Sequence, residues 1–143
     1  MKTTVCCAVL ILVSGLAWAD DCSSQATTQK ATQAQGLVKQ KQFQPAEAPA
    51  RAAIAACPTQ PTAVWALGGS LYGQKRYADA IAAMSNAIAA NQSQAYAYLW
   101  RGQSYYSTKV MDKAIQDFQM FLKLAPNAPE AVSVKQILAA IQA

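Results

Sequence analysis

The chain has 143 residues, a length that fits one modest domain, and its 12 Lys and Arg against seven Asp and Glu give a net charge of +5. Apolar residues make up 53% of the sequence and charged residues 13%, a balance that excludes a disordered chain. The basic residues are scattered and form no stripe, so nucleic acid is not expected as a partner. There is no histidine, and the carboxylates form no metal-loop pattern. We therefore expect no enzyme activity, no metal and no cofactor.

Residues 1–19 have the pattern of a cleaved secretory signal peptide. An almost unbroken apolar run from Val5 to Trp18 follows Lys2, and it ends in an A-x-A cleavage pattern. The run is too short to span a bilayer comfortably, and nothing apolar of comparable length follows, so no membrane span is expected. We expect cleavage after Ala19 and a bacterial protein that is periplasmic or secreted.

A repeat with a period of about 34 residues runs through most of the remaining chain. It is clearest in residues 95–128, where aromatic, small and proline residues recur at the offsets of a known helical repeat. These residues are Tyr98, Gly102, Tyr105, Ala114, Phe118, Phe121 and Pro126. The pattern returns one period earlier in 61–94 and again in 27–60. In this respect the chain resembles the tetratricopeptide-repeat family.

The resemblance implies an all-α fold, an α-solenoid of about three antiparallel helix pairs closed by a C-terminal capping helix. It divides the chain after the leader into an N-terminal extension, three repeats and the capping helix. Those segments are residues 20–26, 27–60, 61–94, 95–128 and 129–143. The last of them carries one apolar stripe and one polar side, as a helix that closes a solenoid requires.

Two glycines, Gly68 and Gly102, fall in the middle of expected first helices, where glycine costs about 1 kcal/mol against alanine. Such a cost needs a packing reason. We expect the partner helix of the same pair to approach closely at each glycine.

The first repeat departs most from the family pattern. Its leading helix is rich in Gln and Thr, and its second helix contains Pro49. Two cysteines, Cys22 and Cys57, stand at ends of these helices that are neighbours in an antiparallel pair. Two unrelated thiols remain an alternative, but we expect a disulfide that staples the weak repeat and adds about 3–4 kcal/mol. The pair lacks C-x-x-C spacing, so a structural role is favoured over redox chemistry.

Members of this family curve into a superhelix whose concave side is lined by the first helices and typically binds peptides. Carried over by register, the candidate partner-binding residues are Val38, Trp65, Gly69, Tyr72, Tyr96, Leu99, Gln103 and Tyr106. Aromatic rings are enriched at binding hot spots, yet the same rings are ordinary packing residues in these repeats. Tyr77, Tyr98, Trp100 and Tyr105 are assigned to packing or to the outer surface. Places at which one subclass grips a terminal carboxylate hold no basic residue here.

The resemblance implies a non-catalytic scaffold or adaptor of the bacterial cell envelope that binds a protein or peptide segment in the concave groove. One alternative is a self-assembling structural protein, because the low charge and the many Ala, Gln and Ser residues suit contacts between copies. A small-molecule pocket among Trp65, Tyr72 and Tyr106 is a further alternative.

Overall fold

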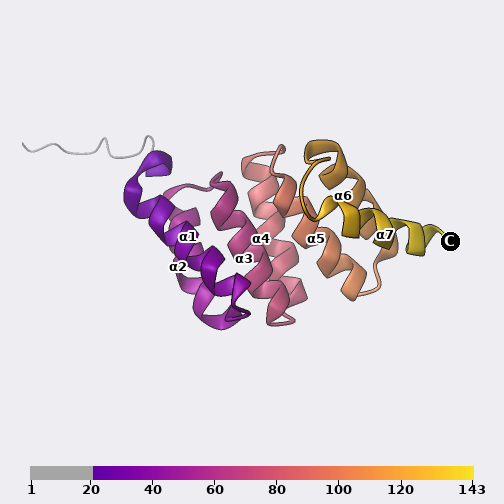
Figure 1. Ribbon diagram of the computed structural model, residues 1–143, viewed down its shortest axis with the longest axis horizontal. Coiled ribbons are helices and arrows are strands. Elements are labelled where there is room, and N and C mark those ends of the chain that lie inside the picture. Colours follow the sequence, from indigo (N-terminus) through magenta and orange to yellow (C-terminus); the bar gives the residue numbers. More distant parts are fainter. Residues whose placement is uncertain (1–20) are drawn as a thin grey trace, which may run out of the picture.

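The computed structural model describes residues 21–143, so the expected signal peptide of residues 1–19 lies outside the described residues. Within 21–143 the chain forms a short 3₁₀ helix and seven α-helices, with no β-strand (Figure 1). The 3₁₀ helix is Asp21–Ser23, and the α-helices are α1 (Gln25–Lys39), α2 (Phe43–Ala56), α3 (Pro61–Gly73), α4 (Tyr77–Ala90), α5 (Ala95–Ser107), α6 (Met111–Leu124) and α7 (Ala131–Gln142). The predicted all-α solenoid is confirmed.

The helices pack as successive antiparallel pairs, α1 with α2, α3 with α4 and α5 with α6. The first helices also form a row of their own, since α1 packs on α3 and α3 packs on α5. The second helices α2 and α4 instead pack on the first helix of the following pair. The pairs therefore follow one another along the molecule, from α1 at one end to α7 and the C-terminus at the other (Figure 1).

Three lysines turn the chain between the two helices of each pair. Lys41, Lys75 and Lys109 occupy the same position in successive repeats, and their φ angles are 61°, 59° and 66°. Each of their peptide N–H groups donates to the carbonyl three residues earlier, at 2.9, 2.9 and 3.1 Å. This is a left-handed helix cap, a conformation usually occupied by glycine. The repeat period is thus present in the backbone as well as in the side chains.

The core changes in character along the chain. Near the first pair it contains Ala31, Ala53 and Ala63, all fully buried. Around α5, α6 and α7 it is built on Phe118 and Phe121, which are also fully buried. Burying a phenylalanine contributes about 1.5–3 kcal/mol, whereas a buried alanine removes far less apolar surface from water. Between these ends, the core around α3 and α4 contains the fully buried Val64, Leu71 and Met84. Apolar burial per residue is therefore smallest at the alanine contacts of the first pair.

Both mid-helix glycines make room for a neighbouring aromatic ring. At Gly102 the ring comes from the expected partner helix, and at Gly68 it comes from another helix. A Cβ at Gly102 would lie 2.9 Å from Phe118 Cδ1 on α6, so the expected approach of the partner helix is found there. At Gly68 a Cβ would collide with Trp100, which belongs to α5 and not to the partner helix α4. The expectation for Gly68 is therefore wrong, because the first helices pack against each other in their own row.

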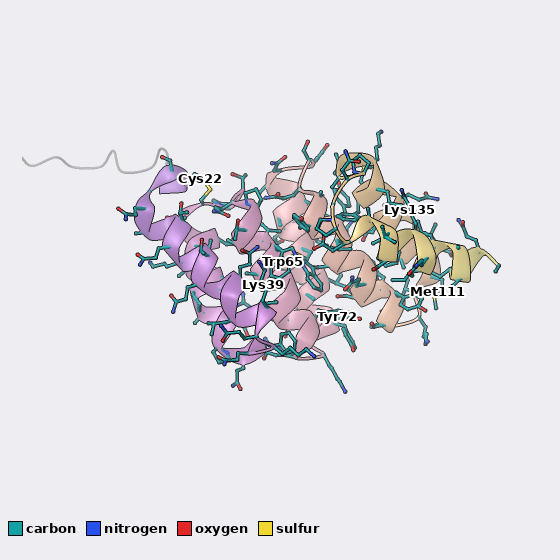
Figure 2. The ribbon with its side chains drawn as sticks, in the orientation of Figure 1. Cys22, Lys39, Trp65, Tyr72, Met111 and Lys135 are labelled. Carbon is teal, nitrogen blue, oxygen red and sulfur yellow. A yellow bond between two sulfur atoms is a disulfide. The ribbon has the colours of Figure 1, made fainter. Side chains whose placement is uncertain are left out.

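A disulfide joins Cys22 to Cys57, whose Cα atoms are 4.7 Å apart (Figure 2). Cys22 lies in the 3₁₀ helix just before α1, and Cys57 caps the C-terminal end of α2. The bridge links the two ends of the first pair that lie farthest from its connecting turn. It therefore holds the alanine-packed pair at its open end.

A nearly buried ion pair connects α5 to α6. The Arg101 guanidinium donates to both carboxylate oxygens of Asp117 at 2.8 Å and also reaches Ser85 Oγ on α4 at 3.2 Å. The hydrogen bond to Asp117 raises the pKa of Arg101 further above its ordinary value, against the opposing effect of burial. A bidentate pair of this kind fixes the register of the two helices as well as their distance.

Candidate functional site

The row of first helices borders a cavity of about 370 Å³. Its wall comes from α1, α3 and α5, and its far side from the segment that leads into α7. The lining residues are Gln35, Lys39, Pro61, Thr62, Trp65, Tyr96, Pro129 and Glu130. Figure 2 labels Lys39 at the end of α1 and Trp65 and Tyr72 on α3. We call the surface of α1, α3 and α5 around this cavity, with its lining residues, the first-helix groove.

Aromatic rings form a continuous wall beside the cavity. The Trp65 ring meets the Trp100 ring edge-on, with centroids 5.9 Å apart and planes at 71°. The Tyr72 ring lies 5.7 Å from Trp100 and 5.4 Å from Tyr77. Offset and edge-on contacts of this kind are the favoured arrangements of aromatic rings. The rings therefore hold one another in place, and the wall is preorganised.

Trp100 is central to this wall, although the sequence assigned it to packing or to the outer surface. Its ring covers the adjacent Gly68 and Gly69 of α3. Its indole Nε1 is buried and has no hydrogen-bond partner among the described residues. The available signal was the pair of consecutive glycines, which predicts a close approach by a large neighbouring group.

Three of the eight predicted contact residues, Val38, Gly69 and Leu99, are buried. Their assignment to an accessible surface is therefore wrong. Leu99 is 0% exposed and belongs to the core around α5 and α6. Val38 is 7% exposed, and it packs so closely on Gly69 that a Cβ there would lie 2.9 Å from Val38 Cγ1. The repeat register places all three on the first-helix face. Contact between α1, α3 and α5 covers Val38 and Gly69, whereas the core shared with α6 and α7 encloses Leu99.

The other five predicted residues, Trp65, Tyr72, Tyr96, Gln103 and Tyr106, are half-buried and retain accessible surface. Trp65 and Tyr96 both line the cavity. The Tyr72 hydroxyl hydrogen-bonds to Ser107 Oγ at 3.1 Å, which ties α3 to the end of α5. The Tyr106 ring has the ammonium of Lys109 6.0 Å from its centroid. Their contact with a partner stays a prediction.

Glu130 supplies the negative charge of the cavity, and sequence reasoning missed its part there. The Trp65 indole Nε1 donates to Glu130 Oε1 at 3.4 Å, across 65 residues of sequence. Glu130 Oε2 is buried and has no hydrogen-bond partner within residues 21–143. Partial burial raises the pKa of the Tyr96 hydroxyl, and the charge of Glu130 raises it further. In the sequence, Glu130 looked only like a polar residue at the start of a capping helix.

A second, smaller cavity of about 180 Å³ lies on the other side of the helix pairs, between α2 and α4. Its lining is mostly apolar and includes Ile54, Pro58 and Leu67. No aromatic ring lines it. The first-helix groove is therefore the better candidate for specific recognition.

Two further features of residues 21–143 bear on function. No cluster of three or more His, Cys, Asp or Glu side chains in this part of the chain could hold a metal ion. Among the described helices, none combines the length and the apolar character needed to cross a membrane.

The tetratricopeptide-repeat family model matches the chain twice, over residues 32–85 and 66–129. Together the two matches extend over more than half of the sequence. No curated protein sequence matches the chain.

Solved structures with the same fold include peptide-bound domains. The first TPR of Spaghetti (RPAP3), bound to the HSP90 peptide SRMEEVD, is 24% identical with a TM-score of 0.71, over 84% of this chain and 98% of that one. The second TPR domain of human RPAP3, in complex with the HSP70 peptide SGPTIEEVD, is 21% identical with a TM-score of 0.67, over 82% and 96%. The Yersinia enterocolitica type III secretion translocator chaperone SycD is 16% identical with a TM-score of 0.73, over 86% and 96%. At these identities the likeness concerns the fold alone.

Proposed function

We propose that this chain, which belongs to the tetratricopeptide-repeat family, is a non-catalytic scaffold or adaptor of the bacterial cell envelope. It binds a segment of a partner protein in the first-helix groove. The observation that carries the proposal is the preorganised aromatic wall of Trp65, Tyr72 and Trp100 beside a cavity of about 370 Å³. Rigid aromatic side chains bury much area at little entropic cost, and for that reason they dominate binding hot spots.

Two of the structures with this fold support peptide recognition as the mode of binding. The Spaghetti domain is bound to an HSP90 peptide and the human RPAP3 domain to an HSP70 peptide. Both peptides end in the letters EEVD. The present chain has the same architecture with its own set of groove residues, so we transfer the peptide-binding mode and not the peptide.

The proposed location outside the cytoplasm rests on two features. Residues 1–19 have the pattern of a signal peptide. The bridge between Cys22 and Cys57 supports the same location, because disulfides are typical of oxidising compartments and cytoplasmic thiols are kept reduced. We propose that the protein works in the periplasm or after secretion.

Affinity capture with variants tests the proposal. We would compare the oxidised wild-type protein with Trp65→Ala in the groove and with Lys113→Ala, an exposed residue on α6. Loss of a hot-spot side chain costs about 2 kcal/mol or more, roughly a 30-fold drop in affinity. We expect Trp65→Ala to lose a partner that Lys113→Ala retains, as measured by quantitative mass spectrometry. Circular dichroism shows whether each variant is folded. A partner kept by Trp65→Ala and lost by Lys113→Ala would contradict groove binding.

Self-assembly is the second candidate, and the exposed apolar residues favour it. Val132 on α7 is 64% exposed and Met120 on α6 is 36% exposed. Both lie near the C-terminal end, where solenoids can stack. Light scattering over a wide concentration range distinguishes the two functions. A mass that grows with concentration in the wild type, and stays monomeric in Val132→Glu, would favour assembly.

A further inference from the structure

We propose that the cavity in the first-helix groove is an anchor pocket for one basic side chain, arginine or lysine, of the partner segment. This inference rests on the proposed function and names the chemistry that the groove selects. It is carried by the carboxylate of Glu130 together with the two aromatic side chains that line the same cavity, Trp65 and Tyr96.

Glu130 has hydrogen-bonding capacity that the described residues do not use. One oxygen, Oε1, accepts from Trp65 Nε1 at 3.4 Å, which is long for an N–H···O bond. The other, Oε2, is buried and receives no hydrogen bond within the described chain. A carboxylate can accept about four hydrogen bonds, and a buried one without donors is costly. A ligand that brings N–H donors and a positive charge removes that cost.

The walls of the cavity suit a cation as well. Trp65 and Tyr96 line the same cavity as Glu130, and the quadrupole of an aromatic ring attracts a cation that lies over its face. A guanidinium can stack on a ring while its edge donates to a carboxylate, and an ammonium can make the same contacts as a point charge. A volume of about 370 Å³ is at the lower end of small-ligand pockets. One side chain therefore fits better than a folded element.

The protein's own cations do not fill this role. Lys39 lines the cavity but is exposed at its rim, and Glu130 takes part in none of the four ion pairs found in residues 21–143. An acidic segment such as the EEVD ending of the peptides above would place carboxylates beside Glu130, where like charges repel. The preference of this groove is therefore opposite in charge to those peptides.

An NMR titration with matched peptides tests the anchor pocket. The probes are three blocked pentapeptides, acetyl-AAXAA-amide, with arginine, glutamine or glutamate at X. They are added to the ¹⁵N-labelled, oxidised protein, and the indole N–H resonance of Trp65 reports the pocket. We expect the arginine peptide to shift this resonance with at least tenfold tighter binding than the glutamine peptide. The glutamate peptide should bind most weakly.

Variants separate the role of Glu130 from that of net charge. Glu130→Gln should bring the arginine and glutamine peptides to within about twofold of each other. Glu130→Asp keeps a carboxylate and should restore part of the preference. Asp112→Asn removes one exposed negative charge from the start of α6 and should leave the preference unchanged. The ¹⁵N spectrum of each variant shows whether it is folded.

Two outcomes would overturn the anchor pocket and leave the proposed function standing. One is equal binding of the three peptides at Trp65, which would keep the groove but remove its charge preference. The other is an arginine preference that survives in Glu130→Gln. No shift of Trp65 by the arginine peptide would also overturn the pocket, and affinity capture with Trp65→Ala would then judge the proposed function separately.

Discussion

The first and last helix pairs have the same backbone architecture but are held together by different interactions. In the first pair most of the buried residues are alanines, such as Ala31 and Ala53, and a disulfide closes the open end. In the last pair Phe118 and Phe121 are fully buried, and α7 covers them with its own apolar stripe. The comparison teaches that the repeat specifies a geometry, while its stabilisation can come from a covalent bond or from apolar burial.

A comparison of the middle and last pairs shows that the same repeat position can hold either an apolar or a charged side chain. Arg101 in α5 stands one repeat period after Leu67 in α3, and Asp117 stands one period after Ala83. Leu67 is 4% exposed and joins an apolar cluster, whereas Arg101 joins a bidentate ion pair. The same site on the repeat therefore carries an apolar contact in one pair and an ion pair in the next.

The largest expected effect is at the aromatic core. Phe118→Ala should destabilise the protein by about 3–5 kcal/mol, because the transfer free energy of the ring is lost and a cavity remains. Ala50→Gly, a substitution in the core of the first pair, should cost only about 0.5–1 kcal/mol. Urea unfolding of both variants in the oxidised protein measures the difference. Similar losses would show that stabilisation is spread evenly between the two ends.

The next largest loss of stability is expected on breaking the ion pair between Arg101 and Asp117. Asp117→Ala should cost about 3 kcal/mol, since it leaves the Arg101 guanidinium partly buried without its carboxylate. The double variant Arg101→Leu with Asp117→Ala copies the middle pair and should recover most of that loss. Thermal or urea unfolding of the two variants gives the answer. A double variant as unstable as Asp117→Ala alone would mean that the ion pair cannot be exchanged for an apolar contact.

Removal of the disulfide should affect the first pair alone. Cys22→Ser with Cys57→Ser should lower stability by about 2–4 kcal/mol, because the unfolded chain regains the freedom of a loop with a sequence separation of 35. Amide hydrogen exchange should accelerate in α1 and α2 and stay nearly unchanged in α5 and α6. Uniform acceleration across the chain would contradict the division into a stapled end and a packed end.

The smallest expected changes in stability are at two glycines, and they have opposite signs. Gly68→Ala should cost about 1–3 kcal/mol, because a methyl group there overlaps the Trp100 ring. Gly36→Ala, in α1, meets no atom within 4 Å and should stabilise the protein by up to about 1 kcal/mol. The midpoint of urea unfolding, followed by tryptophan fluorescence, measures both changes. A neutral Gly68→Ala would show that the aromatic wall can move.

The helix pairs could be predicted from the sequence because the repeat period survives in residues such as Gly68, Gly102, Ala80 and Ala114. The site was predicted less completely. The repeat register treats equivalent positions alike, yet Trp100 occupies the position of Ala66 and becomes the centre of the wall only because Gly68 and its neighbour leave room.

Other parts of the site depend on contacts between residues far apart in the sequence, which a local sequence pattern does not predict. Val38 and Leu99 lie on the expected face, but neither is accessible. Val38 is buried against α3, and Leu99 is buried in the core with α6 and α7. Glu130 reaches Trp65 across 65 residues, because the stacked helices place the start of α7 beside α3. Such contacts arise from the stacking of repeats and not from the sequence of any one repeat.

Site-specific photo-crosslinking in the native cells tests groove recognition most directly. Benzoylphenylalanine would replace Tyr106 on α5, a predicted contact residue, or, in a separate strain, the exposed Lys113 on α6. We predict one discrete crosslinked partner protein from the Tyr106 position and none from the Lys113 position. A partner captured only from Lys113, or capture only of a second copy of this chain, would contradict recognition in the groove.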